Sequence, residues 1–281
     1  MQTKFFKSLA LSLIIALSVV VPATAARPSG GTTTNNNLGI DISYPQCGVK
    51  VPTTQAFGIV GVNGGNAATT NPCLTDQLIW AKKSSGLVAG KDKIQLYVNT
   101  ANPGQVMDQM STKWPTANTA PATNPYGTCT GQNDQACSWQ YGWDRGQYAV
   151  EYFVSKASAA GISVAPETYK WWLDVETMNT WQTGSNAALA NNAAALEGWA
   201  SYFKHINARV GLYSTAYQWN TIVGSSVKSG SSLLGLENWR PGGASQSTAK
   251  QACTAAPLTA GGKVIMTQFV SKSIDYNYSC I

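Results

Sequence analysis

The sequence predicts a TIM-like α/β barrel, modified so that about five β/α units are followed by three strands with few helices. Short apolar runs alternate with helix-period segments along much of the 281-residue chain, and such alternation is typical of a parallel sheet. The strand-like runs number eight, enough to close a barrel whose functional site lies at the carboxyl ends of its strands. Polar side chains recur at those predicted ends.

The predicted strands are short apolar or alternating runs, and the predicted helices show a 3.6-residue apolar period. The strands cover residues 38–43, 57–62, 94–99, 171–176, 209–214, 233–239, 264–269 and 273–278, and the helices cover 74–83, 143–160, 187–206 and 217–222. Residues 100–141 interrupt this pattern and are rich in Asn, Thr, Pro and Gly. Because so long a connection is usually functional, we expect it to form a lid or rim over a cleft.

The N-terminal residues are not expected to join the barrel. Residues 1–25 carry Lys4 and Lys7, an apolar run too short for a transmembrane helix, and a small-residue cleavage site, as in a signal peptide. Residues 26–37 are polar and rich in Gly and Thr, which predicts a flexible spacer. Residues 38–281 form one barrel domain. We therefore expect a secreted, extracellular monomer with no membrane association after cleavage.

The charge of the chain is mildly basic. The formal net charge is +6, and removing Lys4 and Lys7 with the leader lowers it to +4. This balance does not indicate a nucleic-acid partner, but it is compatible with an anionic cell-wall polymer.

The six cysteines predict disulfides, because they are even in number and lie in a chain with an export signal. Six cysteines allow fifteen pairings. We expect sequential pairing, since short loops close locally: Cys47–Cys73, Cys129–Cys137 and Cys253–Cys280. A metal site is disfavoured because there is no CxxC motif and His205 is the sole histidine, so no metal and no cofactor are expected. The single histidine also argues against a Ser-His-Asp triad.

The segment from Trp171 to Thr177 (WWLDVET) contains the main candidate for chemistry. Alternate side chains of a strand share a face, so Asp174 and Glu176 should project to one side, about 6.6 Å apart along the strand. Glycoside hydrolysis needs two such acids, one holding a proton and one ionised. The alternative is a strand that simply ends in solvated polar residues.

The predicted strand ends carry further polar residues that a barrel would bring to one mouth. They are Asp41, Asn63, Asn99, Asp174, Glu176, Tyr213, Glu237, Gln268, Asp275 and Asn277. This convergence favours a catalytic or binding role for the Asp174 and Glu176 pair.

Several motifs, in this order, resemble those of the glycoside hydrolase family 25 muramidases. They are Gly39-Ile40-Asp41-Ile42-Ser43 with Gln46, Leu173-Asp174-Val175-Glu176, Gly211-Leu212-Tyr213-Ser214, and Gln268-Phe269 followed by Ile274-Asp275-Tyr276-Asn277. The resemblance runs from Leu38 to the end of the chain. It implies a modified barrel with five helices and cleavage of the β-1,4 bond between N-acetylmuramic acid and N-acetylglucosamine in peptidoglycan.

The resemblance also implies residue roles. Glu176 would be the proton donor, and Asp174 its partner, which orients the substrate acetamido group or stabilises positive charge. Asp41 and Asp275 would be flanking carboxylates that bind sugar or water. Tyr213, Gln268 and Asn99 are further candidates for substrate binding.

The chain departs from the family pattern in two strands. It has Tyr97-Val98-Asn99 where a Tyr-His-Phe-like motif is usual, and Leu236-Glu237-Asn238-Trp239 at the sixth strand, where a different Trp-containing motif is usual. The insertion 100–141 is also unusual for the family. A related group of exported glycoside-hydrolase-like barrels shares the same general order of motifs, and the chain is similar to that group too.

The second functional hypothesis is a catalytically inactive barrel that binds cell-wall glycan or protein partners through an aromatic rim. Trp143, Trp172 and Trp239 have faces broad enough to stack on a sugar ring. For each of these side chains, packing in the core is the favoured interpretation.

Overall fold

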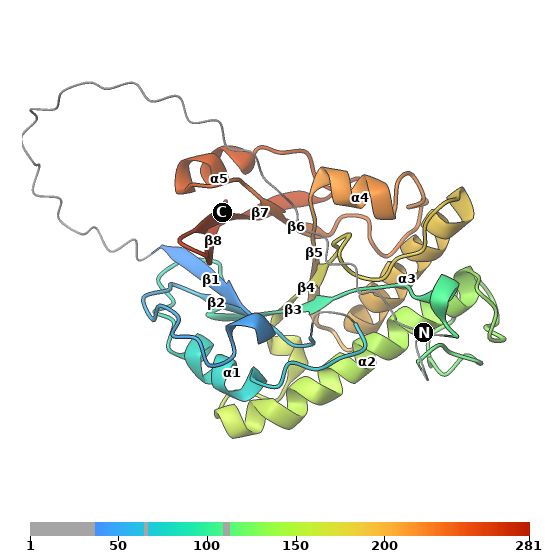
Figure 1. The fold of residues 1–281 in the computed structure, drawn as a ribbon, viewed down its shortest axis with the longest axis horizontal. Coiled ribbons are helices and arrows are strands. Elements are labelled where there is room, and N and C mark those ends of the chain that lie inside the picture. Colours follow the sequence, from blue (N-terminus) through green and yellow to red (C-terminus); the bar gives the residue numbers. More distant parts are fainter. Residues whose placement is uncertain (1–36, 65–66, 109–112) are drawn as a thin grey trace, which may run out of the picture. The chain divides into compact units, whose positions relative to one another are not determined.

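Eight β-strands close into a barrel in which spatial order follows sequence order (Figure 1), which confirms the predicted TIM-like fold. The computed structural model describes residues 37–64, 67–108 and 113–281. The strands are β1 (Leu38–Ile42), β2 (Gly58–Gly61), β3 (Ile94–Asn99), β4 (Lys170–Asp174), β5 (Arg209–Tyr213), β6 (Glu237–Pro241), β7 (Lys263–Ser271) and β8 (Ile274–Ser279). The expected signal peptide 1–25 and nearly all of the spacer 26–37 lie outside the described residues.

The last strand runs against the others. Strands β1 to β7 pair in parallel, whereas β8 is antiparallel to both β7 and β1, a reversal that the sequence pattern, typical of a parallel sheet, did not predict. Only Lys272 and Ser273 connect β7 to β8, with φ of 52° and 59°. Two residues of positive φ make a tight hairpin, whereas a parallel connection needs a crossover of a dozen or more residues. The start of β8 therefore lies at the same rim as the carboxyl ends of β1 to β7.

Five α-helices cover the outside of the barrel in the described ranges (Figure 1), as the family resemblance implies. They are α1 (Leu74–Lys82), α2 (Gln135–Ala160), α3 (Asn186–His205), α4 (Ala216–Ile222) and α5 (Gln246–Ala252). Helix α2 begins before the predicted residue 143 because the Asp134 side chain caps it, accepting a hydrogen bond from the backbone N–H of Cys137 at 2.8 Å. The short helix α5, capped by Ser245, was not predicted.

The apolar side chains form two layers, and β4 contributes to both. Trp171 and Leu173 point outward and pack with α2 and α3, whereas Trp172 points into the barrel. This alternation places Asp174, the next inward position, above the indole of Trp172. Trp143 and Trp172 are both buried in the core, as favoured by the sequence.

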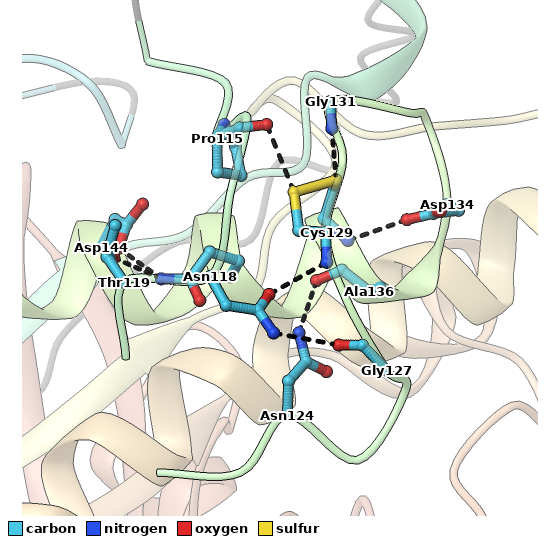
Figure 2. The surroundings of a disulfide bond; sticks show 12 residues. Pro115, Asn118, Thr119, Asn124, Gly127, Cys129, Gly131, Asp134, Ala136 and Asp144 are labelled. Atoms are coloured by element: carbon cyan, nitrogen blue, oxygen red, sulfur yellow. Dashed lines mark hydrogen bonds between the residues drawn. A yellow bond between two sulfur atoms is a disulfide. The ribbon is translucent and has the colours of Figure 1, made fainter. Parts of the chain in front are cut away.

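A disulfide holds the long connection between β3 and α2 (Figure 2). Cys129 and Cys137 are bonded at 2.03 Å, and Asn124 donates a hydrogen bond to the carbonyl of Ala136 at 2.8 Å. Asn118 accepts from the backbone N–H of Cys129 at 3.0 Å. This part of the connection is thus fastened to the first turn of α2.

The predicted disulfide pairing is confirmed for all six cysteines, since Cys47–Cys73 and Cys253–Cys280 are also bonded. Such a set of disulfides fits an extracellular protein. Over the ranges that the structure describes, no helix combines the length and apolar character needed to cross a membrane.

Candidate active site

Four carboxyl groups line one cavity at the rim formed by the carboxyl ends of β1 to β7. They are Asp41 of β1, Asp174 at the end of β4, Glu176 two residues further on, and Asp275 of β8. The cavity has a volume of about 280 Å³, and Tyr97, Tyr213, Trp239 and Gln268 complete its lining. The predicted common side for Asp174 and Glu176 is therefore observed.

Asp41 is buried among amide donors and another acid. Its Oδ2 accepts hydrogen bonds from Gln268 Nε2 at 3.0 Å and from Asn277 Nδ2 at 2.7 Å. Burial, and then repulsion by Asp275, raise the pKa of Asp41 to about 8 despite these donors. Asp41 therefore holds a proton well above the pH at which an exposed carboxyl loses it.

Asp174 is the most deeply buried of the four acids, with 6% of its surface exposed. Burial is the largest cause that raises its pKa well above the usual range, and repulsion by Glu176 and Asp41 adds to it. In the described part of the chain, Asp174 Oδ1 has no hydrogen-bond partner. Its side chain thus holds a proton more tightly than an exposed carboxyl does, and one of its oxygens is free for a ligand.

Glu176 and Asp275 are partly exposed to the cavity. Burial raises the pKa of Glu176, a hydrogen bond from Gln218 opposes this shift, and Asp275 reinforces it. Burial also raises the pKa of Asp275. The whole cluster therefore binds protons more tightly than isolated carboxyls, and Glu176 presents its acid group to the open side.

Tyr213 and Gln268 form a hydrogen-bonded chain that leads to Asp41. Tyr213 Oη donates to Gln268 Oε1 at 2.7 Å, which orients the amide so that Nε2 faces Asp41. The Tyr213 ring also packs on Trp239, with centroids 4.4 Å apart. Both predicted substrate-binding residues thus lie in the cavity with their polar groups ordered.

Asn99 takes a different place from the one that the sequence predicts. It pairs in register with Asp174, but it does not line the acid cavity. Its Nδ2 donates to the carbonyl of Gly64 at 2.8 Å, and its backbone N–H donates to Asn63 Oδ1 at 2.8 Å. The Asn99 amide therefore joins the ends of β2 and β3.

Glu237 lies at the opposite end of the barrel from the predicted mouth. Strand β6 begins at Glu237, four residues after the predicted start at residue 233, so this residue opens the strand. Its carboxylate pairs at 2.7 Å with Lys170, the first residue of β4. An acid at the start of a strand lies at the bottom of the barrel and cannot reach the rim, so Glu237 does not belong to the acid site.

Tyr97, Trp239 and Asn277 belong to the site but were absent from the predicted set of catalytic and substrate-binding residues. Asn277 lies two residues after Asp275 and therefore on the same face of the strand. This spacing could have predicted that Asn277 belongs to the site. Trp239 ends the predicted strand 233–239, and core packing was the favoured interpretation of its side chain, but it both packs in the core and lines the cavity. Within residues 37–64, 67–108 and 113–281, no group of three or more His, Cys, Asp or Glu side chains is arranged so that it could hold a metal ion.

The fold and the site together define a TIM-like barrel with a carboxyl cluster at its rim. No family model matches the chain, and no curated protein matches it.

Several solved structures are similar in fold. Two are forms of the modular Cpl-1 endolysin complexed with a peptidoglycan analogue, each with 13% identity, a TM-score of 0.47, and coverage of 88% of this chain and 54% of the endolysin. A third is the multimodular pneumococcal cell wall endolysin from phage Cp-1, complexed with choline, with 11% identity and a TM-score of 0.45. This chain spans about half the length of these proteins.

Proposed function

We propose that this chain is an exported glycoside hydrolase that cleaves β-1,4 bonds of peptidoglycan. The convergence of Asp41, Asp174, Glu176 and Asp275 in one cavity, with raised pKa values, is the observation that carries the proposal. A glycosidase needs an acid that stays protonated near neutral pH, beside a second carboxyl group. The choice of peptidoglycan as the substrate rests on the resemblance of the motifs to those of the family 25 muramidases. The leader-like N-terminus and the disulfides support export.

Glu176 is the proton donor in this proposal. Its side chain, like that of Asp275, is partly exposed to the cavity, and its raised pKa keeps a proton available for the leaving glycosidic oxygen. Loss of that proton leaves a new negative charge beside other acids, and the raised pKa values of Asp174 and Asp41 reduce the charge that opposes the transfer.

Asp174 assists from the floor of the cavity. Its unpartnered Oδ1 is available to contact the acetamido group of the sugar, or the positive charge that develops at the anomeric carbon. Asp41 and Asp275 flank the pair, while Tyr213 and Gln268 present polar groups to sugar hydroxyls. The substrate is a cell-wall glycan, and the protein acts as a monomer without a cofactor.

The test is the release of new reducing ends from purified peptidoglycan. We expect release by the wild type and a loss of at least about 100-fold with Glu176→Gln, because removal of a general acid costs roughly 10²–10⁴ in rate. Glu167→Gln is the matched control, since Glu167 is exposed and lies in the 3-10 turn before β4. A folded wild type that releases nothing would instead support the inactive, glycan-binding alternative, and equal release by Glu176→Gln would refute the role of Glu176.

A further inference from the structure

Three consecutive backbone carbonyls at the end of β4 each accept a hydrogen bond from a side chain. The carbonyl of Asp174 accepts from Thr100 Oγ1 at 2.6 Å. That of Val175 accepts from Ser214 Oγ at 2.7 Å, and that of Glu176 accepts from Trp181 Nε1 at 2.8 Å. We call Thr100, Ser214 and Trp181 the carbonyl clamp.

The three donors come from different elements around the two acids. Thr100 follows β3, Ser214 follows β5, and Trp181 lies in the connection from β4 to α3. Thr100 and Ser214 are fully buried, so their hydroxyls have no competing water. The clamp therefore joins the Asp174–Glu176 segment to both neighbouring strands and to its own loop.

The segment needs these donors because the regular strand stops at Asp174. Past that point the backbone bonds are few. The N–H of Val175 donates to the carbonyl of Tyr213 at 2.9 Å, that of Thr100 donates to the carbonyl of Asp174 at 3.0 Å, and that of Asn179 donates to the carbonyl of Glu176 at 3.2 Å. A strand end without further pairing can rotate its peptide planes, and each rotation redirects the attached side chain. The side-chain donors add a bond at each of three successive carbonyls and so further restrict this rotation.

The long connection after β3 supports the Trp181 end of the clamp. Gln182 Nε2 donates to Asn102 Oδ1 at 2.9 Å and to Asn133 Oδ1 at 2.7 Å. The backbone N–H of Asn102 donates to the carbonyl of Thr180 at 2.8 Å. The residues on either side of Trp181 are thus held by the connection between β3 and α2, which gives that connection a role at the acid site.

We propose that Thr100, Ser214 and Trp181 are positioning residues that set the directions of the Asp174 and Glu176 side chains. This proposal rests on the proposed hydrolase function. A displacement of a reacting group by about 1 Å can reduce a rate by about 100-fold, and the clamp acts on the backbone atoms from which both acids project. None of the three side chains has to touch the substrate.

The test compares variants that remove the donor group: Trp181→Phe, which also shortens the ring system, Thr100→Val, which is nearly isosteric, and Ser214→Ala, which loses the hydroxyl. Matched controls lose an equivalent bond away from the acids. They are Trp80→Phe, whose Nε1 donates to the carbonyl of Pro52 at 2.7 Å, and Thr259→Val, whose Oγ1 donates to the carbonyl of Leu233 at 2.9 Å. We expect kcat to fall by roughly 10- to 100-fold in the clamp variants, with KM and Tm close to those of the controls.

A second measurement keeps the positioning role separate from the proposed activity. The carboxyl carbons of 13C-labelled glutamates are titrated by NMR, and the Glu176 signal is identified by its absence in Glu176→Gln. Trp181→Phe should displace the Glu176 midpoint and Trp80→Phe should not, whether or not the wild type cleaves peptidoglycan. An unchanged midpoint in Trp181→Phe, or a fall in kcat that the controls share, would overturn the proposal.

Discussion

Asp41 and Asp275 are register partners where the first strand of the barrel meets the last. Because β8 is antiparallel, Asp275 near its start lies beside Asp41 near the carboxyl end of β1, and both side chains line the same cavity. Repulsion between them contributes, after burial, to the raised pKa of Asp41, about 8. This pair makes the electrostatics of the site depend on closure of the barrel.

Replacing Asp275 should therefore lower the pKa of Asp41. In Asp275→Asn the repulsion is gone while the amide keeps the size of the side chain, so ionised Asp41 becomes easier to form. We expect the midpoint of the Asp41 carboxyl, measured by 13C NMR, to move below about 8. Burial still acts, so the midpoint should stay above the ordinary 3.8.

Asp76→Asn provides the control for this titration. Asp76 is exposed on α1, and its replacement should leave the Asp41 midpoint in place. An Asp41 midpoint that is the same in Asp275→Asn and in the wild type would show that burial alone sets the pKa.

The stability of the protein should decline as the pH rises from about 4 to about 8. The pKa of Asp41 is about 8 in the folded chain against an ordinary 3.8, so between these values the native state holds a proton that the unfolded state has lost. The stabilising contribution of protonated Asp41 is complete below pH 3.8 and disappears as the pH rises through about 8. One such proton changes the free energy of unfolding by about 1.4 kcal/mol per pH unit.

Urea unfolding at a series of pH values measures this slope. Asp41→Asn cannot ionise, so the free energy of unfolding of this variant should fall less steeply with pH. The slope should be smaller by up to about 1.4 kcal/mol per pH unit, which corresponds to one proton. The exposed Asp76→Asn variant should retain the wild-type slope. If Asp41→Asn shows an undiminished decline, other groups are responsible for it.

The disulfide between Cys129 and Cys137 should contribute to stability, although it closes a short loop. Its sequence separation is 8, for which loss of loop entropy in the unfolded chain corresponds to about 2–3 kcal/mol. The double variant Cys129→Ser with Cys137→Ser should lower the free energy of unfolding by that amount. Thermal or urea unfolding measures it, and wild-type stability in the double variant would contradict the expectation.

Much of the fold could be predicted because its signals are local. A few consecutive residues are enough to show the two-residue alternation that places Trp171 outside the barrel and Trp172 inside it. The same period puts Asp174 and Glu176 on one side. The alternation of strands and helices gave the order of the barrel, and nearest-neighbour pairing of the cysteines was sufficient for all three disulfides.

The errors arose where a boundary or a direction depends on distant residues. The direction of β8 depends on the two-residue turn at Lys272 and Ser273, which the sequence-based pattern of parallel units concealed. Glu237 was predicted at the mouth of the barrel but lies at its opposite end, because β6 begins only where it can pair with β5 and β7. Asn99 has the expected strand position, but its side-chain amide donates to Asn63 and Gly64 in the loop that follows β2.

The sequence by itself determined the barrel and the common side of Asp174 and Glu176, because periodicity and spacing are properties of neighbouring residues. It favoured, among fifteen possibilities, the cysteine pairing that is observed. Only the tertiary structure decided the company of those acids: Asp275 reaches Asp41 through the reversed last strand, and three donors from separate segments hold the carbonyls of residues 174–176. Their pKa values were likewise undetermined by sequence, since burial and charge repulsion act through space between residues that are far apart along the chain.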